Sequence, residues 1–105
     1  MKYDHIGIPT KEEKEGANYI ESIKAYITPS SENKYGIEWV RILDDSPMPA
    51  ILKTLPHVGF RVDDIEEAVK DVAVENIIVP VCSPAEGMRI AFIMDNGAPI
   101  EFLEY

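Results

Sequence analysis

The stretch PHVGFRV, residues 56–62, combines a strand pattern with a histidine and a glycine that a simple buried strand would not need. Its residues alternate, which gives the strand two faces: Val58, Phe60 and Val62 against His57, Gly59 and Arg61. Residues 63–76, DDIEEAVKDVAVEN, have apolar residues at helical spacing and predict a helix on the apolar face. His57 is therefore expected to point away from that helix, and Gly59 leaves room beside it.

The same pattern occurs near the N-terminus, where DHIGIPT spans residues 4–10. HIGI at 5–8 matches HVGF at 57–60, and IEWV at 37–40 matches IEFL at 100–103. A strand that begins with histidine is thus followed twice by a strand that carries Ile-Glu. This order indicates an internal repeat.

The segments between these motifs fit one domain of 105 residues. The second half, about residues 56–105, is expected to fold as strand, helix, strand, strand, strand. The first half, about residues 1–50, is a compressed version of it, with a short helix or turn at 11–23 and strands at 3–8, 24–30 and 37–43. Pro80 predicts that the strand at 77–82 lies at a sheet edge or carries a bulge.

Composition excludes some classes of function. The chain has 10 Lys and Arg against 19 Asp and Glu, a net charge of −9, which argues against binding to nucleic acid or to an anionic membrane surface. No apolar run approaches the ~20 residues of a membrane span, and the N-terminus lacks the pattern of a signal peptide. The single cysteine, Cys82, suits a reducing compartment. We expect a soluble cytoplasmic protein.

Strand alternation brings two histidines and a glutamate to one face of the expected sheet. Ile100 and Phe102 suit the helix side of the last strand, so Glu101 points to the same face as His57 and His5. Two neutral imidazoles and one carboxylate suit Fe(II), Mn(II), Ni(II), Co(II) or Zn(II) and leave coordination positions open. The alternative is that both histidines are ordinary half-buried residues and that the glutamate faces solvent.

The motifs DHIGI, PHVGFRVDD and GAPIEFLEY resemble the glyoxalase / vicinal-oxygen-chelate superfamily, which includes bleomycin-resistance and dihydroxybiphenyl dioxygenase-like proteins. The resemblance implies an α+β fold in which two βαβββ modules, the first one truncated, form a curved half-barrel around a divalent metal. It implies metal ligands at His5, His57 and Glu101. Glu38 is a fourth ligand if IEWV is the last strand of the first module. If IEWVRIL is instead the third strand, Glu38 is an ordinary strand residue.

The resemblance also implies a function, namely isomerase, lyase or epimerase chemistry on a small metabolite with vicinal oxygens. Glu101 and Glu38 are then the catalytic residues, with a loosely held glutamate as the base. Arg61 is a candidate for holding an anionic substrate group, and Trp39 for stacking on a substrate ring. Extradiol dioxygenase-like activity and non-catalytic binding of a small ligand remain alternatives, and a homodimer is the expected assembly.

Overall fold

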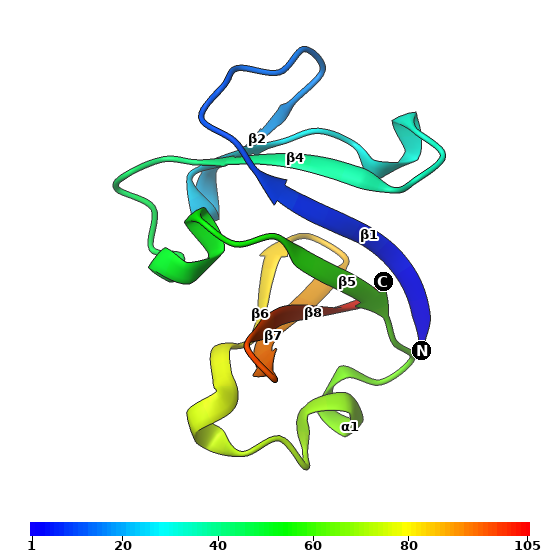
Figure 1. Cartoon of the computed structure of the whole chain (residues 1–105). Coiled ribbons are helices and arrows are strands. Elements are labelled where there is room, and N and C mark those ends of the chain that lie inside the picture. Colours follow the sequence, from blue (N-terminus) through cyan, green and yellow to red (C-terminus); the bar gives the residue numbers. More distant parts are fainter.

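The computed structural model describes all 105 residues and consists of one mixed sheet of eight strands that curls into a half-barrel (Figure 1). The strands are β1 (Lys2–Pro9), β2 (Asn18–Ile20), β3 (Ala25–Ile27), β4 (Ile37–Ile42), β5 (His57–Arg61), β6 (Ile77–Ala85), β7 (Met88–Asp95) and β8 (Ala98–Glu104). The helical segments are α1 (Ile65–Val69) and the 3-10 turns η1 (Glu21–Ile23), η2 (Ser30–Glu32), η3 (Ala50–Lys53) and η4 (Val74–Asn76). The predicted α+β class is confirmed.

The strand order across the sheet is β2-β3-β4-β1-β5-β8-β7-β6. The central strands β1 and β5 are antiparallel, and each pairs on its other side with a parallel strand, β4 or β8. The remaining strands add antiparallel neighbours toward each edge. Strand β6, which contains Pro80, lies at an edge and has irregular register, as the proline predicted.

The helix in the structure is shorter than the one predicted over residues 63–76. Helix α1 ends at Val69, and Ala73 is already extended, with φ −58° and ψ 138°. The β-branched residues Val69, Val72 and Val74 are weak helix formers. The segment after Val69 therefore has little intrinsic tendency to continue the helix. Asp64 caps the N-terminus of α1, because its side chain accepts a hydrogen bond from the Glu67 amide at 3.3 Å.

Between residues 11 and 23 the expected short helix or turn is confirmed in part, because the 3-10 turn η1 lies at Glu21–Ile23 but a short strand precedes it. Residues 10–17 form a loop in which Gly16 has a φ of +81°, and the chain then enters the three-residue strand β2. A strand this short leaves almost no alternation to recognise.

Strand β4, which covers IEWVRI at residues 37–42, is preceded by β1, β2 and β3 and is therefore the fourth strand of the chain. The alternative in which IEWVRIL is a third strand is wrong.

Two apolar clusters cover the two faces of the second half of the sheet. On the helix side the cluster comprises Ile65, Ala91, Ile93 and Phe102, with Phe60, Val62 and Ile100 packed against it. On the inner side it comprises Leu52, Ile90, Phe92 and Leu103. The predicted alternation of β5 and β8 is therefore confirmed, and it directs His57 and Glu101 to the inner side.

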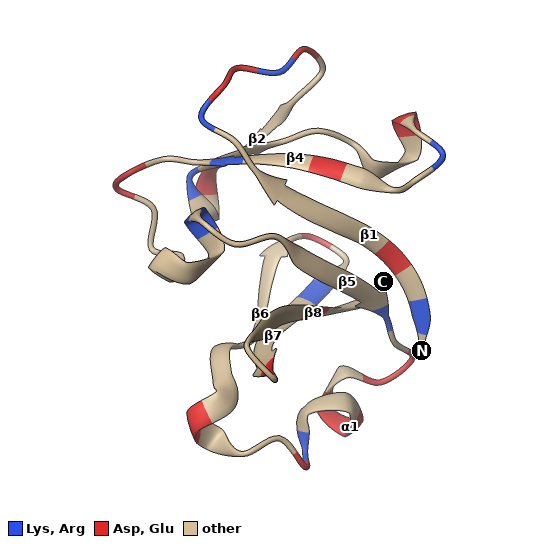
Figure 2. Ribbon diagram, viewed as in Figure 1, with Lys and Arg blue, Asp and Glu red and all other residues tan.

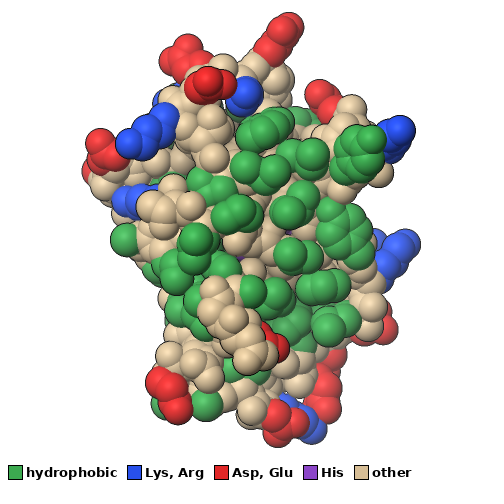
Figure 3. Space-filling view, viewed as in Figure 1, with side chains coloured by type: hydrophobic (Ala, Val, Ile, Leu, Met, Phe, Trp, Pro, Cys, Tyr) green, Lys and Arg blue, Asp and Glu red, His purple; other side chains and the backbone are tan.

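Charged residues lie mostly in loops and at the ends of elements, outside the curl of the sheet (Figure 2). On the face shown in Figure 3, hydrophobic side chains form a continuous area over β1 and β5, and charged groups lie around it. None of the helical segments is long and apolar enough to cross a membrane.

Candidate metal centre

The pairing of β1 with β5 brings the two histidines together. His5 lies opposite Gly59, and His57 lies opposite Gly7. A methyl group at Gly59 would lie 2.3 Å from Cε1 of His5, and one at Gly7 would lie 2.2 Å from Cε1 of His57. Each glycine therefore makes room for the imidazole of the neighbouring strand, which explains why the HxG pattern occurs twice.

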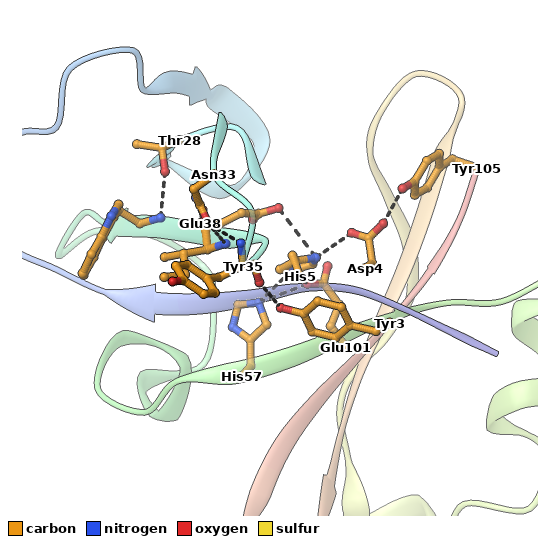
Figure 4. Close-up of polar contacts among 12 residues, drawn as sticks. Tyr3, Asp4, His5, Thr28, Asn33, Tyr35, Glu38, His57, Glu101 and Tyr105 are labelled. Atoms are coloured by element: carbon orange, nitrogen blue, oxygen red, sulfur yellow. Dashed lines mark hydrogen bonds and ion pairs between the residues drawn. The ribbon is translucent and has the colours of Figure 1, made fainter. Parts of the chain in front are cut away.

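Three donor atoms meet at one point inside the half-barrel (Figure 4). Nε2 of His5 lies 3.3 Å from Nε2 of His57. Oε1 of Glu101 lies 3.0 Å from Nε2 of His5 and 3.1 Å from Nε2 of His57. Adjacent ligands that bind one ion at about 2.1 Å lie roughly 3 Å apart. These three atoms therefore suit one shared metal ion.

The cluster is buried, since His5 is 1 % exposed and His57 and Glu101 are each 7 % exposed. Burial by itself raises the pKa of the Glu101 carboxyl, but hydrogen bonds and charge from the two histidines outweigh it and hold this pKa below its usual value. Burial by itself lowers the pKa of His5, but Glu101, Glu38 and Asp4 outweigh it and raise the pKa to about 9. In the metal-free protein, the positive charge of the His5 imidazolium thus balances the negative charge of the buried Glu101 carboxylate.

Glu38 has the same place on β4 that Glu101 has on β8. Glu38 is in register with Gly7, and Glu101 is in register with Gly59. The Glu38 side chain nevertheless reaches the other side of the His5 ring, where Oε2 lies 3.6 Å from Nδ1. Burial raises its pKa to about 7, with Glu101 and Asp4 adding to the effect and His5 opposing it.

Asp4 is a site residue that the sequence did not reveal. Its Oδ2 lies 2.7 Å from Nδ1 of His5, and its Oδ1 accepts a hydrogen bond from the Tyr105 hydroxyl (Figure 4). Strict alternation would place Asp4 on the face opposite His5. The register of β1 with β5 shifts between Tyr3 and His5, so Asp4 is an extra residue in a bulge and its side chain reaches the ring edge.

Asp4 should increase metal affinity, because a hydrogen bond from Nδ1–H of His5 to its carboxylate leaves Nε2 unprotonated for the metal. We expect Asp4→Asn to weaken binding of Zn(II) by about 10–100-fold, the usual cost of removing such an outer partner. The measurement is competition with a chromogenic chelator. Asp71→Asn, which changes an exposed aspartate in the turn after α1, is the matched control. Equal affinities of the two variants would contradict the role of Asp4.

The metal-free protein should lose stability as the pH rises from 6.5 to above 9. The folded-state pKa of His5 is raised to about 9, so its contribution is complete below the unfolded value of about 6.5 and disappears above 9. The contribution is at most about 3 kcal/mol. Thermal unfolding in a chelating buffer between pH 6 and 9.5 measures it. The slope should be smaller in His5→Ala, and an unchanged slope would refute this account of His5.

A cavity of about 150 Å³ opens over the cluster. Its polar wall is formed by His5, His57, Glu101 and Glu38, and the rest is apolar: Ile20, Ile23, Ile27, Val40, Ile42, Met48, Leu52, Pro84, Met88, Ile90, Phe92 and Leu103. Both halves of the chain contribute to the wall. The arrangement can bind a small molecule with its polar end at the cluster and its apolar end against the wall.

The two candidate substrate-binding residues lie elsewhere. Arg61 is exposed, its Nε donates to the main-chain oxygen of Tyr105 at 3.0 Å, and its guanidinium stacks 4.0 Å from the ring of Tyr105. Trp39 follows Glu38 on β4 and therefore faces the opposite side of the sheet, where Lys14 lies 4.6 Å from its ring. Neither residue lines the cavity over the cluster.

Comparison with known proteins supports the fold only. No family model matches the chain, and no curated protein matches it. Among solved structures, the chain is similar to hypothetical protein BH1468 from Bacillus halodurans C-125, with a TM-score of 0.63 and 20 % sequence identity over 99 % of this chain and 94 % of that one. At this identity the likeness shows a shared fold.

Proposed function

We propose that the protein is a small metal-dependent enzyme of the glyoxalase / vicinal-oxygen-chelate type, built from two βαβββ modules of which the first lacks its helix. The pairing of β1 with β4 and of β5 with β8 supports the modules, because both pairs are parallel and both align a glycine with a glutamate. The loop at residues 10–17 takes the place of a first helix.

The observation that carries the proposal is the convergence of three donor atoms, 3.0–3.3 Å apart, in the wall of a mostly apolar cavity. His5, His57 and Glu101 would hold one divalent ion, of which Ni(II), Mn(II), Fe(II), Co(II) and Zn(II) suit the donor set. When bound, such an ion would stabilise negative charge that develops on a substrate oxygen.

Glu38 is the residue proposed to move a proton. A pKa of about 7 leaves its carboxyl partly ionised at neutral pH, which suits a group that accepts a proton and returns it. Glu38 would take the proton from a substrate carbon beside the two oxygens. Return to the same carbon gives epimerisation, and return to the neighbouring carbon gives isomerisation.

Hydrogen–deuterium exchange tests this role. The protein, loaded in turn with each of the five metals, is incubated in D₂O with small vicinal-oxygen compounds such as hydroxyacetone and acetoin, and loss of the C–H signal is followed by NMR. We expect catalysed exchange that Glu38→Gln slows by ~100-fold or more. The absence of catalysed exchange with every metal would refute the enzyme and favour its main alternative, a module that only binds a ligand in the apolar cavity.

A further inference from the structure

We propose that the site accepts a small substrate that carries no charge beyond its two adjacent oxygens, such as an α-hydroxy ketone, a 1,2-diol or a catechol with a short hydrocarbon remainder. Substrates with a phosphate, a carboxylate or a large charged carrier would be excluded. This inference rests on the proposed function, because the cluster must present the oxygens to a metal.

The walls of the cavity carry the inference. Apart from the cluster and Glu38, the wall is apolar and includes Ile20 and Ile23 from the first half and Met88 and Phe92 from β7. The lining includes no lysine and no arginine. An anionic group of a substrate would therefore enter the cavity without a positive partner apart from the metal, and burial of an unpaired charge is strongly unfavourable.

The arginine side chains make contacts outside the cavity. Arg89 is held by the carboxylates of Glu66 and Glu104, at 2.9 Å from Oε1 of Glu104. Arg41 stacks 4.3 Å from the ring of Tyr26 on the opposite face of the sheet. None of these cations lines the cavity, so none is positioned to receive a substrate anion.

The acidic residues at the cavity also disfavour binding of an anionic substrate. Glu101 and Glu38 both line the cavity, and Asp4 stands behind His5. A further carboxylate or phosphate would be placed near these like charges, which is unfavourable where water is excluded. The net charge of −9 adds a repulsion at longer range.

The size of the cavity sets an upper limit on the substrate. Its volume of about 150 Å³ is below the range of roughly 300–1,000 Å³ that is usual for sites of drug-sized ligands. The substrate is therefore a compound of few non-hydrogen atoms, bound with its hydrocarbon part against the isoleucine, methionine and phenylalanine side chains.

Matched ligands test the inference. Binding of 4-methylcatechol and of 3,4-dihydroxybenzoate to the Zn(II)-loaded protein is measured by calorimetry. The two ligands share the chelating oxygens and differ by a methyl group against a carboxylate, and 3,4-dihydroxybenzamide controls for the size of the carboxylate. We expect the methyl compound to bind at least ~100-fold more tightly than the carboxylate, with the amide between them.

A variant should reduce the preference for the uncharged ligand if the inference is correct. Met88→Lys puts a cation on the cavity wall and should strengthen binding of 3,4-dihydroxybenzoate relative to 4-methylcatechol by ~10-fold or more. Val74→Lys adds the same charge at a site that is 81 % exposed and should leave the ratio unchanged.

The outcomes separate this inference from the proposed function. If the protein binds Zn(II) but prefers the carboxylate, or binds none of the three ligands, the inference is wrong and the metal site stands. If Zn(II) does not bind, the ligands are measured with Ni(II), Mn(II), Fe(II) or Co(II) instead. If none of the five ions binds, the proposed function is wrong and the inference is overturned with it.

Discussion

Glu101→Gln should remove tight binding of divalent metal, with a loss of affinity greater than the roughly 10–100-fold that an outer partner costs. Glu101 is the only carboxylate that lies within 3.1 Å of Nε2 of both histidines, so its charge is the main electrostatic attraction for the ion. An amide keeps the shape of the side chain and removes that charge. Chelator competition with Zn(II) and Co(II) measures the affinity.

Two comparisons make the Glu101 result specific. Glu75→Gln changes an exposed glutamate on η4 and should bind metal like the original protein. In the metal-free Glu101→Gln variant the pKa of His5 should also fall, because Glu101 provides the strongest of the contacts that raise it. NMR titration of the ring protons checks this. A variant that retains full metal affinity would show that Glu101 is not a ligand.

Gly59→Ala should be, with Gly7→Ala, among the most damaging of the small substitutions in the sheet. The added methyl group would lie 2.3 Å from Cε1 of His5, and its ring is fixed between Glu101 and Asp4. Overpacking of this kind costs about 1–3 kcal/mol in the free energy of unfolding. The displaced ring should also weaken metal binding. Chemical denaturation of the metal-free protein and chelator competition measure the two effects separately.

A double-mutant cycle identifies the cause of the Gly59 effect. In a His5→Ala background the ring is absent, so Gly59→Ala should cost at most a few tenths of a kcal/mol. Because each free energy is referred to its own background, the loss of His5 itself cancels. If the cost of Gly59→Ala were the same in both backgrounds, the glycine would be required for the strand and not for the imidazole.

The sequence was most informative where the chain alternates over whole strands. In residues 57–62 and 100–103 every second side chain is apolar, and the packing of Phe60 and Phe102 against α1 follows directly from that alternation. The convergence of His57 and Glu101 on the inner side could therefore be predicted. His5 could be predicted from the second copy of the HxG pattern.

Other features depend on contacts between distant residues and could not be predicted. Asp4 reaches His5 only because of the bulge in β1, which interrupts the alternation. The strand β2 exists because its three residues pair with β3, and no local pattern marks it. The apolar wall gathers Leu52 from the 3-10 turn η3 and Ile20 from β2, and neither segment has a periodicity that indicates which side it faces.

The central claim is that His5, His57 and Glu101 hold one metal ion, and the metal content of the purified protein tests it most directly. The protein and its His57→Ala variant are prepared side by side without chelator and measured by elemental analysis. We predict one divalent transition-metal ion per chain in the original protein and none in the variant. No ion in either protein, together with no rise in melting temperature when Ni(II), Mn(II), Fe(II), Co(II) or Zn(II) is added, would contradict the claim.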